Sequence, residues 1–164
     1  MIVVFSFAMV FAAARDIQTL TIPNGVSVML ILAFLGAALV AGLSWQNLLV
    51  HLATGSIMLL VGIFLFSMGW FGGGDAKLLA AGSLWIGLDH LAPFLIYVGL
   101  SGGLLAVTVL AYRQSQTGKI LAAHLPGWAE RLHIKGSGIP YGIAIAAGAL
   151  IVFPSSNLFA LLAV

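Results

Sequence analysis

The sequence contains no cysteine and very little charge. None of its 164 residues is Cys, and only 6% are Asp, Glu, Lys or Arg. The lack of cysteine excludes disulfides, thiolate zinc sites and cysteine nucleophiles, although it says nothing about the compartment. Soluble globular domains carry about a quarter charged residues, so the low charge and a hydrophobic content of 62% indicate an integral membrane protein. Four acids and six basic residues are too few to suggest nucleic-acid binding.

Long apolar runs occupy most of the chain. A hydrocarbon core of about 30 Å needs roughly 20 helical residues, and four runs approach or exceed that length: 24–43, 48–68, 91–112 and 141–162. Two shorter runs, 1–14 and 78–88, bring the set to about six. No basic residue precedes the first run and its charges follow it, which favours an uncleaved span over a signal peptide. The predicted fold is an all-α membrane protein, a polytopic bundle of about six transmembrane helices in a single domain over residues 1–164.

The basic residues predict the orientation of this bundle. With six spans, the connectors 15–23, 69–77 and 113–140 lie on one side of the membrane, and only the last is long. All the Lys and Arg residues fall in these three connectors: Arg15, Lys77, Arg113, Lys119, Arg131 and Lys135. The positive-inside rule makes this side cytoplasmic and places both termini outside.

Two of the four acids are candidates for chemistry. Asp89 is expected in an outer turn and Glu130 in the long loop, where solvated roles are ordinary. Asp16 and Asp75 instead lie at the cytoplasmic ends of predicted helices that otherwise carry no charge. Singly, each has a structural explanation: Asp75 would suit a helix N-cap before AKLL, and Asp16 could mark the interface beside Arg15. A cap, however, needs neither three consecutive glycines nor a second carboxylate at the same depth.

Paired carboxylates at one level of a bundle can catalyse hydrolysis. Two carboxylates held close do not both ionise readily, so they share one proton. The ionised partner can take a proton from water while the protonated partner polarises a peptide carbonyl. This chemistry needs no metal or cofactor, and we expect neither, since no HExxH pair or phosphate-loop spacing is present.

The residues around both aspartates resemble those of a known family. FGGGDAKLLAA (71–81) is similar to the GxGD-x-K element of prepilin peptidases, with Gly72, Gly74, Asp75 and Lys77 in the matching positions. GIPYGIAIAAGAL (138–150) resembles the last span of the same family, so the similarity covers most of the chain in the expected order.

The family's other element has its counterpart upstream. RDIQTLTIPN (15–24) resembles an aspartate at the end of one span followed by Pro-Asn, here Pro23 and Asn24, at the start of the next. GxGD alone is a weak pattern, but its combination with Asp16 and the Pro-Asn pair is specific.

The resemblance implies a membrane aspartic endopeptidase with Asp16 and Asp75 as catalytic residues. Such enzymes remove the short basic leader from type IV prepilins and pseudopilins at the cytoplasmic face of the bacterial inner membrane. Bifunctional members also N-methylate the product and carry a cysteine-containing cytoplasmic insert. This sequence contains no cysteine, so it more closely resembles the short Flp/Tad form, without a methyltransferase or zinc-binding insert. The implied partners are a prepilin or pseudopilin and the lipid bilayer, and the oligomeric state is left open.

Several residues around the two aspartates have more than one possible role. Lys77 could bias the charge of Asp75 or contact headgroups, and Asn24 could hydrogen-bond near the site or complete a cap. Pro23 is expected to open the second helix, and Tyr141 is either an interfacial aromatic or a substrate contact. Gly72 and Gly74 would let a peptide backbone approach Asp75.

Two other functions compete with the peptidase. A small ion-coupled transporter would use intramembrane acids as relays, but both candidate acids lie at one face of the membrane. A non-catalytic membrane subunit of a pilus or secretion assembly would tolerate asparagine in place of either aspartate.

Overall fold

All regular structure in the described residues is helical. The computed structural model describes residues 1–115, 127–134 and 138–163. The longer helices are α1 (Ile2–Thr19), α2 (Asn24–Val40), α3 (Trp45–Ser67), α4 (Gly73–Ile86), α5 (Leu91–Gln114) and α8 (Tyr141–Val152). The shorter elements are α7 (Gly127–His133), η1 (Phe153–Ser155) and α9 (Asn157–Leu162). In the described part of the chain α1, α3 and α5 are long and apolar enough to cross a membrane, and the predicted all-α membrane bundle is confirmed.

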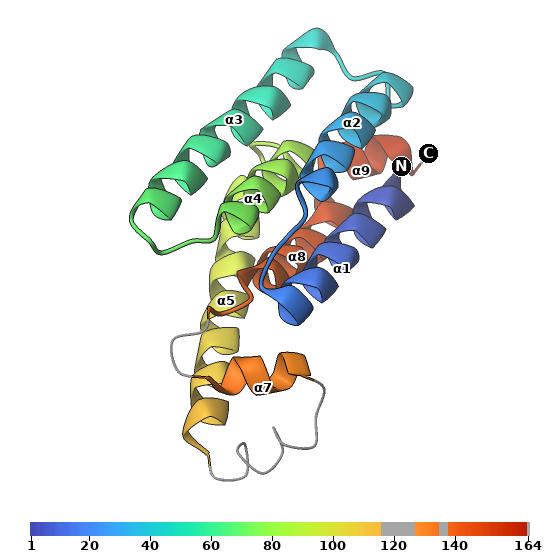
Figure 1. The fold of residues 1–164 in the computed structure, drawn as a ribbon. Coiled ribbons are helices and arrows are strands. Elements are labelled where there is room, and N and C mark those ends of the chain that lie inside the picture. Colours follow the sequence, from blue (N-terminus) through green and yellow to red (C-terminus); the bar gives the residue numbers. More distant parts are fainter. Residues whose placement is uncertain (116–126, 135–137, 164) are drawn as a thin grey trace.

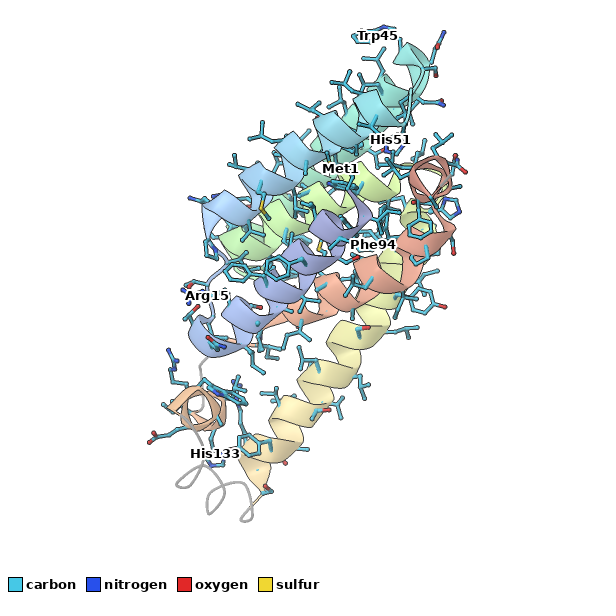
Figure 2. The ribbon with its side chains drawn as sticks, turned by 90° about the vertical axis from the view of Figure 1, so that its right-hand side faces the viewer. Met1, Arg15, Trp45, His51, Phe94 and His133 are labelled. Carbon is cyan, nitrogen blue, oxygen red and sulfur yellow. The ribbon has the colours of Figure 1, made fainter. Side chains whose placement is uncertain are left out.

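Helix α4 forms the centre of the bundle. Nearly all its residues from Asp75 onward are buried, because α2 and α3 pack on one side of it and α8 on another. Helix α8 also packs against α1 and α5, and α5 continues past the bundle to the level of α7 (Figure 1). Arg15 and His133 lie toward this end of the molecule, whereas Trp45 and His51 lie toward the opposite end (Figure 2).

Helices α1 and α4 each extend five residues beyond their predicted limits. Helix α1 continues past residue 14 to Thr19, which places Asp16 in its last turn. It ends at Leu20, whose φ of 53° is left-handed and whose N–H donates to the Asp16 carbonyl. Pro23 then keeps Ile22 out of the helical region. Helix α4 begins at Gly73 rather than at residue 78, so two of the three glycines are helical.

The expected single helix over 141–162 is wrong. Helix α8 ends at Val152, a short 3-10 turn follows, and α9 begins at Asn157. Pro154 lacks the N–H that a continuous helix needs, and the Ser156 hydroxyl accepts from the Phe159 N–H to cap the new helix. Within the long connector, 119–125 lies outside the described residues, and α7 occupies part of the remainder.

Aromatic side chains fill the bundle at the end away from Asp16 and Asp75. We call Phe5, Phe34, Trp85 and Phe153 the aromatic cluster; all are essentially inaccessible. The Phe5 ring centroid lies 5.0 Å from that of Trp85 and 4.2 Å from that of Phe153. The Trp85 indole N–H donates to the Leu30 carbonyl over 2.9 Å, which satisfies the one polar atom of the cluster. This packing joins α1, α2, α4 and η1 at one level.

Candidate active site

The carboxyl group of Asp16 is held by the first turn of α8. Its Oδ2 accepts a hydrogen bond from the Gly142 N–H over 2.7 Å, and the residue is only 4% exposed. Gly142 is the second residue of α8, where backbone N–H groups have no partner within the helix and the dipole favours negative charge. A Cβ on Gly142 would lie 2.8 Å from this same oxygen. The absence of a side chain at position 142 therefore permits the contact.

Asp75 is attached to its own helix by one oxygen. It is the third residue of α4, and its Oδ2 accepts from the Gly72 N–H over 3.2 Å. Gly72, and not Asp75, is the N-cap residue, but Asp75 accepts the N-cap N–H as in a capping box, so the expected capping role is confirmed at the third helical position instead of at the N-cap itself. A Cβ on Gly72 would lie 2.8 Å from Oδ2, which explains the glycine there. The other oxygen, Oδ1, is buried and makes no hydrogen bond to the described residues, which leaves it available to a water or a substrate group.

Ile22 lies between the start of α4, which carries Asp75, and the start of α8, whose Gly142 binds Asp16. A Cβ on Gly74 would lie 3.1 Å from the Ile22 Cβ, and one on Gly142 would lie 2.9 Å from the Ile22 Cδ1. The starts of α4 and α8 therefore both pack against Ile22, which brings Asp75 and the Gly142 amide that binds Asp16 to the same region of the bundle. We call Asp16 and Asp75 the carboxylate pair. Gly74 also has a packing role, beside the expected access for a peptide backbone.

The remaining candidates lie around this pair in two groups. Pro23 is the residue just before α2, and Asn24 is the first residue of that helix. The Lys77 ammonium donates to the Asn24 Oδ1 over 2.7 Å, so it joins α4 to α2 on the other side of α4 from Asp75. Tyr141 opens α8, and its ring centroid lies 5.7 Å from that of Phe71.

Two arginines hold the chain around Asp16, and no local pattern predicted these contacts. The Arg131 guanidinium of α7 donates to the Gln18 carbonyl in the last turn of α1. Arg113, at the end of α5, donates to the Leu132 carbonyl over 2.7 Å and to the Gly138 carbonyl over 3.2 Å. Gly138 lies just before α8, so these contacts support both helices that define the Asp16 environment.

Gly142 and Ile22 were also not among the candidates. Ile22 lies in the segment 15–24 and Gly142 in the segment 138–150, but their roles depend on contacts between residues distant in sequence. Only the glycine itself, beside Tyr141 at the start of an apolar run, could have indicated close approach.

The site combines two buried carboxyl groups that each accept a hydrogen bond from a backbone amide, and one Asp75 oxygen has no further partner among the described residues. Such an arrangement can accept a proton from water and donate one to a carbonyl. No group of three or more His, Cys, Asp or Glu side chains that could hold a metal occurs within the ranges described.

These features define a class, an all-helical membrane protein with a carboxylate pair at one end of its bundle. A family model described as the type IV leader peptidase family matches residues 3–107, which include both aspartates. The chain belongs to this family.

One curated relative extends the match. The chain is 28% identical over 152 residues to the prepilin leader peptidase/N-methyltransferase of Bacillus subtilis (strain 168). The alignment covers 92% of this chain and 54% of the relative, so the chain spans about half the length of that protein. No solved structure matches the chain.

Proposed function

We propose that this protein is a membrane-embedded aspartic endopeptidase that removes the short basic leader from type IV prepilins and pseudopilins of the Flp/Tad kind. The observation that carries the proposal is the carboxylate pair: Asp16 is oriented by the Gly142 amide, and Asp75 has one buried oxygen with no hydrogen bond from the described part of the chain. Family membership and the printed name of the relative support the peptidase activity. The proposal does not extend to N-methylation.

In the proposed reaction the pair begins with one proton between its two carboxyl groups. The ionised carboxylate takes a proton from water, whose oxygen attacks the scissile carbonyl carbon. The protonated carboxyl gives its proton to the carbonyl oxygen as the tetrahedral intermediate forms. When the C–N bond breaks, the amine takes up the proton held by the first carboxyl, and the intermediate hydroxyl returns its proton to the second. The pair thus ends with one proton, as it began.

The proposed location is the cytoplasmic face of the bacterial inner membrane. The same end of the bundle carries the carboxylate pair, Arg15, Lys77 and the arginines near α7. By the positive-inside rule this end faces the cytoplasm, where the basic leader of a precursor would lie. Both aspartates are placed at helix ends rather than at helix centres, which favours a peptidase at the interface over an ion relay across the bilayer.

The test replaces each carboxyl group by an isosteric amide. Asp16→Asn and Asp75→Asn should each lower cleavage of a purified precursor by about 10³-fold or more, because neither amide can transfer the proton. Cleavage would be followed by mass spectrometry in proteoliposomes, with Asp89→Asn as the matched control at the other end of the bundle. Normal processing by either pair variant would refute the proposed mechanism. A wild-type protein that cuts no precursor would refute the peptidase function and leave the non-catalytic subunit as the better hypothesis.

A further inference from the structure

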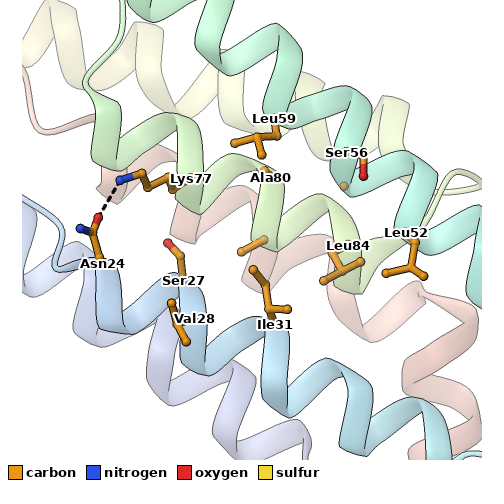
Figure 3. A pocket seen from close by; sticks show the side chains of 12 residues that line it. Asn24, Ser27, Val28, Ile31, Leu52, Ser56, Leu59, Lys77, Ala80 and Leu84 are labelled. Carbon is orange, nitrogen blue, oxygen red and sulfur yellow. Dashed lines mark hydrogen bonds between the residues drawn. The ribbon is translucent and has the colours of Figure 1, made fainter.

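An apolar groove lies between α2, α3 and α4. Its volume is about 420 Å³, and three helix faces form it: 24–31 of α2, 52–59 of α3 and 77–84 of α4. Each face contributes residues at positions i, i+3, i+4 and i+7, the spacing of one side of a helix over two turns. Figure 3 shows α4 between the other two helices, with side chains from all three directed into the same space. Helices α2 and α3 pack on α4 much more than on each other, so the groove is open along its length.

The dimensions of the groove match part of a helix. A two-turn helical stretch about 10 Å across and 10 Å long occupies roughly 800 Å³, so the groove would hold about half of its volume. Gly55, Ala80 and Ala81 line it, and small residues of this kind allow helix backbones to approach closely in membranes. An extended peptide fits less well, because its backbone groups would lack partners in the bilayer and the lining is almost entirely apolar.

One end of the groove lies beside the candidate active site. Lys77 and Asn24 close this end with their hydrogen bond (Figure 3). Lys77 follows Asp75 by two positions, which is about 3 Å along the helix axis and about 200° around it. The Lys77 end of the groove and Asp75 are therefore at about the same depth, on opposite faces of α4. Between them lies the first turn of α4, where residues 72–74 are all glycine and where Phe66 and Ile22 pack beside Gly73 and Gly74.

We propose that this groove binds an apolar membrane-spanning helix of the substrate and holds the end of that helix at the depth of the carboxylate pair. The inference rests on the proposed function and adds a second recognition surface to it. The enzyme then selects its substrates partly by a helix in the bilayer, and the groove sets the depth at which the substrate chain leaves that helix.

The first test compares two substrates and two matched variants. Ser56→Trp places a large ring in the groove from α3, whereas Ile57→Trp places the same ring on the neighbouring face, at a residue that is 56% exposed. For a full-length precursor in proteoliposomes, Ser56→Trp should raise KM by about tenfold, and Ile57→Trp should leave it unchanged. A soluble peptide with the leader and scissile bond, but no apolar helix, should be cut equally by both variants and by wild type. An equal KM for the precursor in Ser56→Trp and wild type would overturn the inference while the peptidase function stood.

The second test does not depend on turnover. A photoreactive benzoylphenylalanine at Val28, on the α2 wall, should form an adduct with the apolar helix of a precursor in an Asp75→Asn background. The same probe at Leu104, which is 71% exposed on α5 away from the groove, should not. Adducts with lipid alone at Val28, together with normal cleavage by the wild-type protein, would overturn the groove assignment and leave the proposed function intact.

Discussion

Both ends of the bundle are built from α1, α4 and the chain around α8, but their interiors differ. At one end the aromatic cluster fills the space between helices with large rings that contact one another. At the other end Gly72, Gly74 and Gly142 remove side chains where helices meet, and two carboxyl groups occupy the space.

This difference between the two ends predicts that changes there will have different effects on stability and on cleavage. Packed aromatic rings gain many dispersion contacts and hold the helices at fixed distances. Glycines contribute little packing, but they bring backbone N–H groups within reach of Asp16 and Asp75. We therefore expect changes at the carboxylate end to affect cleavage most and changes at the aromatic end to affect stability most.

The largest effect is expected at Gly142. Gly142→Ala places a Cβ 2.8 Å from the Asp16 Oδ2, so the carboxyl group or the start of α8 must move. A displacement of this size near reacting groups should lower kcat by about 100-fold. Gly148→Ala is the matched control, because its Cβ would lie 2.7 Å from the Val98 Cγ2, in the same helix but away from the carboxylate pair. Equal losses of cleavage per folded molecule in both variants would contradict a specific role for Gly142.

A smaller effect is expected at Arg131. Arg131→Gln removes the charged donor to the Gln18 carbonyl and the cation near the C-terminus of α1. Because this end of α1 carries Asp16, kcat should fall by about fivefold with little change in KM. Arg131→Lys should restore part of the activity, since it keeps the charge. A loss of thermal stability with unchanged kcat would show that Arg131 supports the fold and not the position of Asp16.

The smallest effect on cleavage is expected at Trp85. Trp85→Ala leaves a cavity within the aromatic cluster and should lower the free energy of unfolding by about 3 kcal/mol. At a temperature where the variant remains folded, cleavage should stay within about twofold of wild type, because Asp75 lies at the other end of α4. Denaturant titration in lipid micelles and a precursor assay would measure the two quantities. A large loss of cleavage in the folded variant would mean that the two ends are coupled.

The helices, their order and the positions of both aspartates at helix ends could be predicted from the sequence, because these features depend on composition and local motifs. Apolar runs marked the spans, and the glycines and Pro-Asn pair marked the neighbourhoods of Asp75 and Asp16. Local patterns also located the start of α2 at Asn24.

Other features depend on contacts between segments that are distant in sequence. The partner of Asp16 is an amide 126 positions away, and Ile22 matters only because two helix starts converge on it. The break after Val152 did have a local signal in Pro154, but the surrounding apolar residues hid it. The extension of α1 to Thr19 was not predicted, because the apolar run stops at Arg15 and Asp16 whereas the helix continues through them.

The long separation between Asp16 and Gly142 has a consequence for biosynthesis. At about 5–20 residues per second, the ribosome needs roughly 6 to 25 s to add the 126 positions between them. Throughout that interval α1 exists without the amide that later binds its carboxyl group. A carboxylate in the last turn of a helix can remain hydrated at the membrane surface while it waits, whereas one at the helix centre would face hydrocarbon. The position of Asp16 at a helix end is therefore compatible with the nascent chain as well as with the folded protein.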